Sequence, residues 1–186
     1  RYHTDRNKAI GSAASGLSPY IHFGHISVHQ LIHHVFELES WNTSKLASKP
    51  NGSRQGWWGM SACAEMFIDE IITWRELGYV FSHRHPTDYF KLNSLPSWAL
   101  KTIEEHKDDP RPITYTLEQL DQSQTHDAVW NAAQTQLREE GIIHNYIRML
   151  WAKKIYEWSP SAELALDRLI ELNNTYAIDG RDPNSY

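Results

Sequence analysis

Cysteine is almost absent from this sequence of 186 residues, which contains only Cys63. One cysteine excludes a framework of intrachain disulfides and a zinc site made of several thiolates, and it fits a reducing compartment. Long hydrophobic runs are absent too, since none approaches the roughly 20 residues of a membrane-spanning helix. We therefore expect neither a disulfide-stabilised fold nor a membrane protein.

Signals for β-strands are also scarce. No segment shows a convincing alternation of β-branched residues, whereas apolar residues recur at the three- and four-residue spacing that is typical of amphipathic helices. Hydrophobic residues make up 40% of the chain and charged residues 22%, a balance that excludes a disordered tail. The sequence is instead rich in aromatic residues, and its eight tryptophans are more than a generic helical core needs.

The apolar spacing and the breaker residues predict an all-α fold. The predicted helices cover about residues 25–40, 61–81, 97–106, 116–120, 125–140, 143–158 and 161–173. Ser97 and Ser161 are expected to cap helix N-termini, and Gly141 is expected to end a helix. Residues 42–56 and 82–96 are predicted to be long loops.

The length suits one domain with its own core, and we expect a single helical domain over residues 1–186. The chain begins at Arg1 rather than Met and ends without a closing secondary-structure element. We interpret it as a piece of a longer protein, so its formal net charge of -5 describes that piece only.

Three segments combine residue types that can bind a ligand. The first is SGLSPY (15–20), in which small hydroxyl residues and glycine directly precede a helix. Backbone N–H groups and hydroxyls in such a loop can bind phosphate oxygens. A simple capped helix start explains the same residues, and on this segment alone it is the better interpretation.

The second segment is DEIITWREL (69–77). Glu70 and Trp74 are four residues apart, so on an α-helix they share one face, with Asp69 and Arg75 displaced from it. A carboxylate beside an indole offers a place where a flat aromatic ligand can stack and be hydrogen-bonded at its edge. The alternative, which the spacing alone favours, is an amphipathic helix with a solvated charged side.

The third segment is the predicted helix around HNYIRMLWAKK (144–154). Arg148, Trp151 and Trp158 fall on one stripe of this helix. A buried arginine needs a carboxylate partner, and the later turn that contains Asp179 could supply it. A purely structural ion pair explains this arginine equally well.

Histidines at four-residue spacing suggest a metal site at first sight. His25, His29 and His33 form such a ladder, but they lack the carboxylate or cysteine partner that most catalytic zinc sites have. We therefore expect packing or surface roles for them, and no bound metal.

Taken together, these segments resemble the FAD-binding helical domain of the photolyase/cryptochrome family, and most closely its class II cyclobutane pyrimidine dimer photolyases. The resemblance covers essentially the whole chain. It rests on LSPYIHFG (17–24), WREL (74–77), THD (125–127), WNAAQ (130–134), WAKKI (151–155) and DGRDPN (179–184). Each motif is weak alone, but their joint order and spacing is specific. The resemblance implies a catalytic domain that binds FAD, and an amino-terminal α/β domain outside this chain that would house an antenna chromophore.

The resemblance implies cofactor contacts residue by residue. The residues concerned are Tyr2, Ser15, Leu17, Ser18, Arg75, Gln134, Arg148, Asn173 and Asp179. The first four would contact the diphosphate and ribityl chain of FAD, whereas Arg75 and Gln134 would line the cofactor cavity. Asn173 would face the flavin N5, and an uncharged donor there favours a reduced, anionic flavin. Arg148 and Asp179 match an ion pair beside the isoalloxazine ring.

The resemblance also implies contacts with the substrate. Glu70 would hydrogen-bond the damaged bases, Trp74 would form one wall of the lesion pocket, and Met149 would touch the lesion. Glu70, Trp74 and Asn173 are thus the predicted catalytic residues. The pair Asn145-Tyr146 departs from the residues usual in relatives, which could alter the lesion pocket.

Three tryptophans match the electron-transfer chain of class II enzymes. They are Trp151, Trp130 and Trp158, with Trp151 nearest the flavin. Closely spaced indoles can pass an electron inward from the surface, which would photoreduce FAD. The alternative is that each is simply a large core residue.

The activity implied is light-driven repair, in which reduced FAD donates one electron to a pyrimidine dimer flipped out of DNA. The expected partner is DNA that contains pyrimidine dimers, with Lys153, Lys154 and Arg181 as local cations for its backbone. We expect a monomer, in the cytoplasm of a bacterium or archaeon or in the nucleus of a eukaryote.

Two alternatives stay open. One is a cryptochrome-type flavin photoreceptor without repair activity, against which Glu70 and Trp74 speak because they suit a lesion pocket. The other is a helical interaction module that has lost FAD, against which the joint presence of Ser15, Arg148 and Asp179 speaks.

Overall fold

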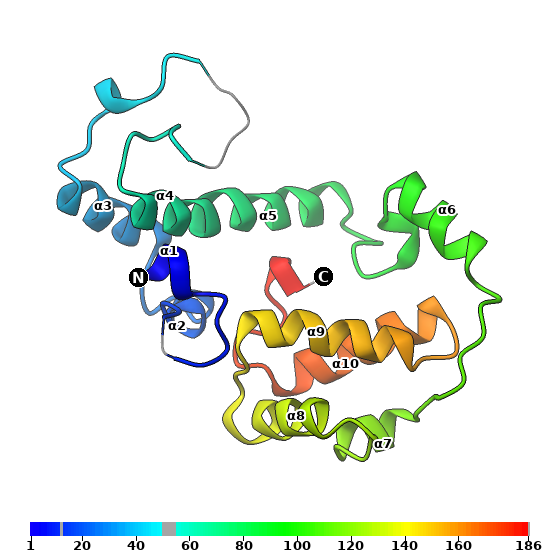
Figure 1. Ribbon diagram of the computed structural model, residues 1–186. Helices are drawn as coiled ribbons and strands as arrows, with labels where there is room; N and C mark the ends of the chain where they lie inside the picture. The colour runs from blue at the N-terminus through cyan, green and yellow to red at the C-terminus, as the bar shows by residue number, and fades with distance from the viewer. Residues whose placement is uncertain (12, 50–54, 186) are drawn as a thin grey trace. The chain divides into compact units, whose positions relative to one another are not determined.

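The computed structural model describes residues 1–11, 13–49 and 55–185, and these contain helices and turns but no β-strand. The prediction of an all-α fold is confirmed. The chain divides into two compact units, Arg1–Val80 and Phe81–Tyr186 (Figure 1). That both belong to one cofactor-binding domain stays a prediction.

The first unit contains short helices at its start and one long helical rod. Its elements are α1 (Tyr2–Asp5), α2 (Ser18–His22), α3 (Val28–Leu38), the 3₁₀ turn η1 (Thr43–Lys45) and α4 (Ala62–Ile68). The π-helical segment η2 (Asp69–Trp74) then joins α4 to α5 (Arg75–Arg84), which crosses into the second unit. The helix predicted at 61–81 is therefore confirmed, with two differences: it continues to Arg84, and its middle is not α-helical.

Serine caps fix where two of these helices begin. The Ser27 side chain accepts a hydrogen bond from the backbone N–H of Gln30 at 3.1 Å, and Ser61 accepts one from Ala64 at 3.3 Å. Each bond satisfies one of the N–H groups that the first turn of a helix leaves unpaired. The start predicted near residue 25 is thus displaced to Val28.

A buried carboxylate organises the loop that precedes α4. The Glu65 side chain is only 2% exposed, and it accepts backbone N–H groups from Gly56, Trp58 and Gly59 at 2.5, 3.1 and 2.9 Å. Gly59 has φ +66°, and a Cβ there would lie 2.4 Å from the carbonyl oxygen of Lys45. The loop therefore depends on one charge for its backbone hydrogen bonds and on one glycine for its close approach.

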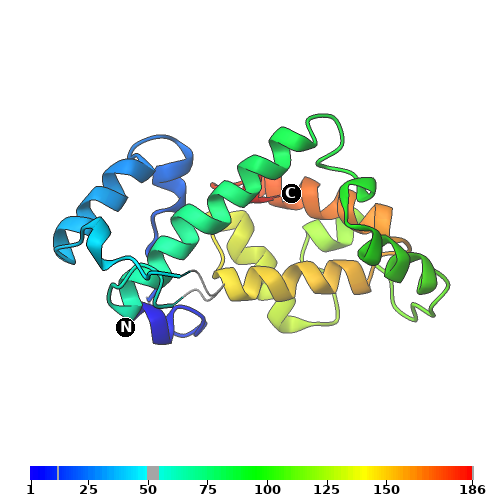
Figure 2. The ribbon, with the colours of Figure 1, turned by 90° about the horizontal axis from the view of Figure 1, so that it is seen from above.

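The second unit packs three longer helices together. Its elements are η3 (Leu92–Ser94), α6 (Ser97–Glu105), α7 (Leu117–Asp121), α8 (Ala128–Glu140), α9 (Asn145–Glu157), α10 (Ala162–Tyr176) and η4 (Pro183–Ser185). Helix α9 packs against both α8 and α10, and the three lie side by side in both views (Figures 1 and 2).

The ends of these helices show which sequence signals were reliable. Ser161 caps α10 by accepting the N–H of Leu164 at 3.3 Å, and Gly141 ends α8 in the left-handed region at φ +71°. Both predictions are confirmed. The prediction that Ser97 caps α6 is wrong, because the capping position is Pro96 and Ser97 is already helical. Proline fixes an extended residue at this point, so the helix starts directly after it.

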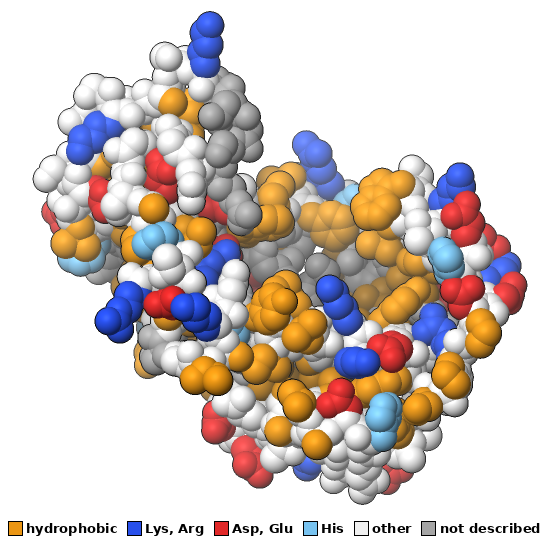
Figure 3. Space-filling view, viewed as in Figure 1, with side chains coloured by type: hydrophobic (Ala, Val, Ile, Leu, Met, Phe, Trp, Pro, Cys, Tyr) orange, Lys and Arg blue, Asp and Glu red, His pale blue; other side chains and the backbone are white. Residues whose placement is uncertain are grey.

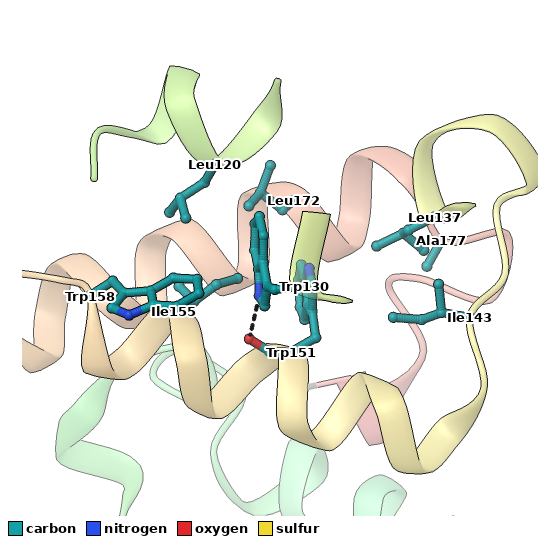
Figure 4. Packing of buried hydrophobic residues seen from close by; sticks show 9 residues of the cluster. All are labelled: Leu120, Trp130, Leu137, Ile143, Trp151, Ile155, Trp158, Leu172 and Ala177. Carbon is teal, nitrogen blue, oxygen red and sulfur yellow. Dashed lines mark hydrogen bonds between the residues drawn. The ribbon is translucent and has the colours of Figure 1, made fainter. Parts of the chain in front are cut away.

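The core of the second unit consists of nine buried apolar residues (Figure 4). They are Leu120, Trp130, Leu137, Ile143, Trp151, Ile155, Trp158, Leu172 and Ala177. Three of the nine are tryptophans, so this core contains three of the eight tryptophans of the chain. None of the helices in the described part of the chain is long and apolar enough to cross a membrane.

The loop held by Glu65 generates a prediction. Replacing the carboxylate with the neutral amide in Glu65→Gln turns an amino group toward backbone donors and should cost about 2 kcal/mol of local stability. Amide hydrogen exchange of residues 55–61 in the full-length protein should accelerate by about tenfold or more, since 1.4 kcal/mol corresponds to tenfold. The matched change at the exposed Glu37, Glu37→Gln, should leave this exchange unaltered. Equal protection in both variants would contradict the role given to Glu65.

Candidate functional site

Three indoles are in contact inside the second unit. Trp130 lies on α8, Trp151 lies on α9, and Trp158 is the residue that ends α9. The rings of Trp130 and Trp151 stack with an interplanar angle of 2° and a centroid distance of 6.4 Å. Trp158 meets Trp130 edge to face, with centroids 5.5 Å apart. All three side chains are buried. The three tryptophans predicted to act together are therefore neighbours, although their role stays a prediction.

Hydrogen bonds fix the orientation of this stack. The Trp130 Nε1–H donates to the backbone oxygen of Trp151 at 3.1 Å (dashed line in Figure 4), and the Trp151 Nε1–H donates to Oε1 of Gln134 at 2.9 Å. Asp127 caps α8 and accepts the N–H of Trp130 at 3.0 Å. Because the indole N–H groups of Trp130 and Trp151 both have an acceptor, these two rings have one preferred arrangement.

Two buried side-chain nitrogens, one on α8 and one on α9, have no hydrogen-bond partner among the described residues. Gln134 is fully buried, and its Nε2 has no hydrogen-bond partner among the described residues. The same holds for Nε of Arg148. Buried donors without partners are uncommon, so a bound molecule that accepts hydrogen bonds would complete both groups.

The predicted ion pair between Arg148 and Asp179 is present. Nη2 of Arg148 donates to Oδ1 of Asp179 at 3.0 Å, with 26% and 19% of the two side chains exposed. Gly180 allows the turn after Asp179 to close on α10, since a Cβ there would lie 2.8 Å from the backbone oxygen of Asn173. The buried Asn173 therefore sits in the last turn of α10 against the turn that carries the ion pair.

The first unit contains the other predicted cluster, and here the assumed register is wrong. Asp69 does not lie displaced from Trp74, because its Oδ2 accepts the Trp74 Nε1–H at 3.2 Å. The π-helical segment η2 inserts one residue into the turn, so residues five apart become neighbours. Glu70 instead forms an ion pair with Arg6 at 2.5 Å.

Arg6 connects Glu70 to the first helix. The guanidinium lies over the ring of Tyr2, 5.7 Å from its centroid, and Tyr2 meets Phe67 edge to face at 5.8 Å. Burial raises the pKa of the Tyr2 phenol, and the hydrogen bond and charge of Arg6 partly offset that rise. Arg6 was missed by the sequence analysis because its contact with Glu70 spans 64 positions and leaves no local pattern.

For the remaining cofactor residues predicted in the first unit, the interactions found within the described residues are with residues close in sequence. Arg75 pairs with Glu76 and lies 4.3 Å from the ring centroid of Tyr79. Oγ of Ser15 accepts the N–H of Leu17 at 3.4 Å. Leu17 is the N-cap residue of α2, and no side chain caps that helix. The alternative of an ordinary capped helix start is therefore wrong, and the hydroxyl of Ser18, the first residue of α2, does not cap it.

Two predicted substrate contacts are open to solvent within their own units. Trp74 and Met149 are each 51% exposed. Figure 3 shows hydrophobic side chains at the surface over α9, where Tyr146, Met149 and Leu150 are exposed. Exposed aromatic and thioether groups are suited to contact with an apolar or flat ligand.

Within the described residues, no group of three or more His, Cys, Asp and Glu side chains is arranged to hold a metal ion. His33, one member of the histidine ladder, lies 3.3 Å from Glu37 of the same helix. His29 and His33 are exposed on α3, whereas His25 is exposed in the turn before that helix.

Comparison with known proteins gives consistent matches over the whole chain. No protein-family model matches it. The chain is 40% identical over 186 residues to a protein named deoxyribodipyrimidine photo-lyase from Oryza sativa subsp. japonica and 40% identical to the one from Arabidopsis thaliana. It is 37% identical over 181 residues to the one from Methanothermobacter thermautotrophicus. The matched segment is 33%, 34% and 35% of those relatives, so the chain spans about a third of their length.

An all-α chain with whole-length similarity to these proteins is a helical segment of a photolyase-type protein. The chain thus resembles, over its whole length, a segment of proteins of the photolyase type.

The ion pair in the second unit generates a prediction that can be measured by a double-mutant cycle. Arg148→Met and Asp179→Asn should each destabilise the full-length protein, and their coupling free energy should be about 1–3 kcal/mol because both groups are partly buried. The measurement is the free energy of urea-induced unfolding of the four proteins. The exposed pair Lys101–Glu105, at 3.6 Å, is the control and should couple by less than about 0.5 kcal/mol. Equal coupling in both pairs would show that the pair at Asp179 has no special role.

Proposed function

We propose that the protein to which this chain belongs repairs cyclobutane pyrimidine dimers in DNA with light, as a class II photolyase. The observation that carries the proposal is the contact of Trp130 with both Trp151 and Trp158. The whole-length similarity to proteins named deoxyribodipyrimidine photo-lyase supports it. In this proposal residues 1–186 form the helical domain that binds FAD, and the protein acts as a monomer on DNA.

The residues present fit a flavin. The unsatisfied Nε2 of Gln134 and Nε of Arg148 are donors, and the edge of an isoalloxazine ring offers carbonyl oxygens and ring nitrogens as acceptors. Asn173 supplies a neutral amide in the same unit, buried beside the turn of Asp179. In the first unit, Tyr2, Ser15, Leu17, Ser18 and Arg75 are the proposed contacts of the remainder of FAD.

Bound FAD in its reduced, anionic form supplies the photochemistry, namely transfer of one electron to the dimer after absorption of blue or near-UV light. The chain's own residues bind and orient the reactants. Arg148, held by Asp179, would place a positive charge beside the bound flavin, which would favour the anionic form of the cofactor. Asn173 would donate a hydrogen bond to the cofactor without adding a charge.

The tryptophans are assigned to the photoreduction of oxidised FAD. Indoles in van der Waals contact pass a single electron by short hops, so Trp158, Trp130 and Trp151 form a path from the edge of the core inward. The Trp151 indole keeps its orientation because Gln134 accepts its N–H. One side chain thereby serves both the proposed ring contact and the electron path.

Glu70, Trp74 and Met149 are the proposed contacts of the lesion. Exposed Trp74 offers an indole face on which an extruded base can stack, worth about 1–3 kcal/mol per base. Glu70 is held by Arg6 and can accept hydrogen bonds from base N–H groups. Lys153, Lys154 and Arg181 are proposed to contact phosphates locally, since the chain as a whole carries a formal net charge of -5. We place the protein in the cytoplasm or nucleus, where its DNA substrate lies.

The proposal predicts the behaviour of the full-length protein. It should purify with FAD, and the chemically reduced form should restore thymine absorbance in dimer-containing DNA only under illumination. Glu70→Gln should lower the yield of repair without loss of FAD, because it weakens an acceptor for the bases. FAD-loaded, reduced protein that repairs no dimers in light would contradict the photolyase proposal and favour a photoreceptor. Protein without FAD would favour a helical interaction module.

A separate prediction concerns Trp151→Phe. Phenylalanine is much harder to oxidise than tryptophan, so light should no longer reduce oxidised FAD in this variant, whereas repair by chemically reduced protein should persist. The measurement is the flavin absorption spectrum during illumination, followed by the repair assay. Trp98→Phe, which changes an exposed tryptophan of α6, is the control and should photoreduce normally. Normal photoreduction in Trp151→Phe would remove this residue from the path.

A further inference from the structure

An open pocket lies in the second unit, between α10 and the connector that precedes α6. Its volume is about 420 Å³, within the range of about 300–1,000 Å³ that is usual for small-molecule sites. Its walls are formed by Tyr89, Phe90, Asp167, Ile170 and Glu171. None of these residues belongs to the contacts proposed for FAD or for the lesion, so the pocket needs an explanation of its own.

Hydrogen bonds within the connector hold the aromatic wall of this pocket. The backbone N–H of Tyr89 donates to the backbone oxygen of His85 at 3.0 Å. The backbone N–H of Lys91 donates to the oxygen of Asp88 at 2.8 Å, and the hydroxyl of the buried Ser94 donates to the oxygen of Lys91 at 2.8 Å. Because η3 packs against α10, the connector and the helix form the two walls together.

The two rings of the connector suit a positively charged ligand. Tyr89 and Phe90 meet edge to face with centroids 5.2 Å apart, and 40% of Phe90 is exposed. The face of an aromatic ring attracts a cation. Nζ of Lys91 lies 5.3 Å from the Phe90 centroid, so this ring already has an ammonium group beside it. The ring is therefore placed for the contact that an amine ligand makes.

The helical wall supplies two negative charges. Asp167 and Glu171 are exposed and four residues apart on α10, so their Cβ atoms lie about 5–6 Å apart on one face and the two carboxylates repel each other. Glu171 accepts a hydrogen bond from Thr175 at 3.4 Å, and neither carboxylate forms an ion pair with a cation of the described residues. Arg168 is engaged elsewhere, since its Nη1 donates to Ser159 at 2.9 Å. A ligand with two positive groups would relieve the repulsion.

The surroundings of the carboxylates favour an organic cation over a metal ion. Among the described residues no group of three or more His, Cys, Asp and Glu side chains is arranged to hold a metal. Ile170 lies in the same wall and is half-buried, so it offers apolar surface beside the two charges. A hydrated Mg²⁺ gains nothing from such a surface, whereas a chain of methylene groups does.

We propose that this pocket binds an aliphatic polyamine of the spermidine type. Two ammonium groups pair with Asp167 and Glu171, and the methylene chain between them lies along Ile170. A further ammonium group contacts the faces of Tyr89 and Phe90. The inference does not depend on the proposed function, because it uses neither the flavin contacts nor the tryptophans.

The test is isothermal titration calorimetry of the full-length protein with spermidine at physiological ionic strength. The native protein should bind one spermidine. Butylamine, which has a single ammonium group, should bind at least about tenfold more weakly because it leaves one carboxylate unpaired. Glu171→Gln should weaken spermidine binding by at least about tenfold for the same reason. Phe90→Leu keeps an apolar side chain but removes the aromatic face, so it should weaken binding about two- to fivefold.

The matched control is Glu163→Gln, the same substitution at an exposed carboxylate in the first turn of α10, which should leave the affinity unchanged. Equal losses in Glu163→Gln and Glu171→Gln, or displacement of spermidine by equimolar Mg²⁺, would reveal non-specific charge attraction and overturn the proposal. Native protein that binds no spermidine, or binds butylamine equally well, would also overturn it. Since the two amines are compared on native protein, this comparison stays decisive even where a variant misfolds.

Discussion

The second unit depends on the buried contact between Trp130 and Trp151. Each indole buries about 150–250 Å² and the pair adds about 0.5–1.5 kcal/mol, but each also brings an N–H that would cost about 1–3 kcal/mol if left unpaired. Both N–H groups are paired, because the backbone oxygen of Trp151 accepts the N–H of Trp130 and the side chain of Gln134 accepts the N–H of Trp151. Helices α8 and α9 are thereby fixed in rotation and in height, because a small slide would break both bonds. The contact that stabilises the core is also the one through which we propose that an electron passes.

The turn after α10 likewise combines a structural role with a proposed functional one. Gly180 lets the chain turn back within van der Waals reach of the Asn173 backbone, and the turn brings Asp179 to Arg148 on α9. The ion pair therefore joins two helices as well as setting a charge at the proposed ring site. Its partial burial is tolerated because the guanidinium is bonded to a carboxylate, whereas its Nε has no hydrogen-bond partner among the described residues.

Much of this was predictable from the sequence, and the exceptions have physical reasons. The Ser161 cap, the Gly141 terminus and the Arg148–Asp179 pair follow from local chemistry or from a motif whose order is specific. Ser97 failed as a cap because the neighbouring proline decides where α6 begins. Arg6 could not be found at all, since a pairing across the first unit has no signature in spacing.

The wrong register at Asp69 is the most instructive of these cases. A helical wheel assumes 3.6 residues per turn, and under that assumption Glu70 shares a face with Trp74. One π-helical segment rotates the rod so that Asp69 takes the indole N–H and Glu70 is left to pair with Arg6. The two groups proposed to contact the lesion are thus each held by a different partner. π-Helical turns lack the ordinary i to i−4 hydrogen bonds, so they need stabilisation from other contacts. They are frequent at functional sites. The departure from regular helix is itself an argument that this face of the first unit binds a ligand.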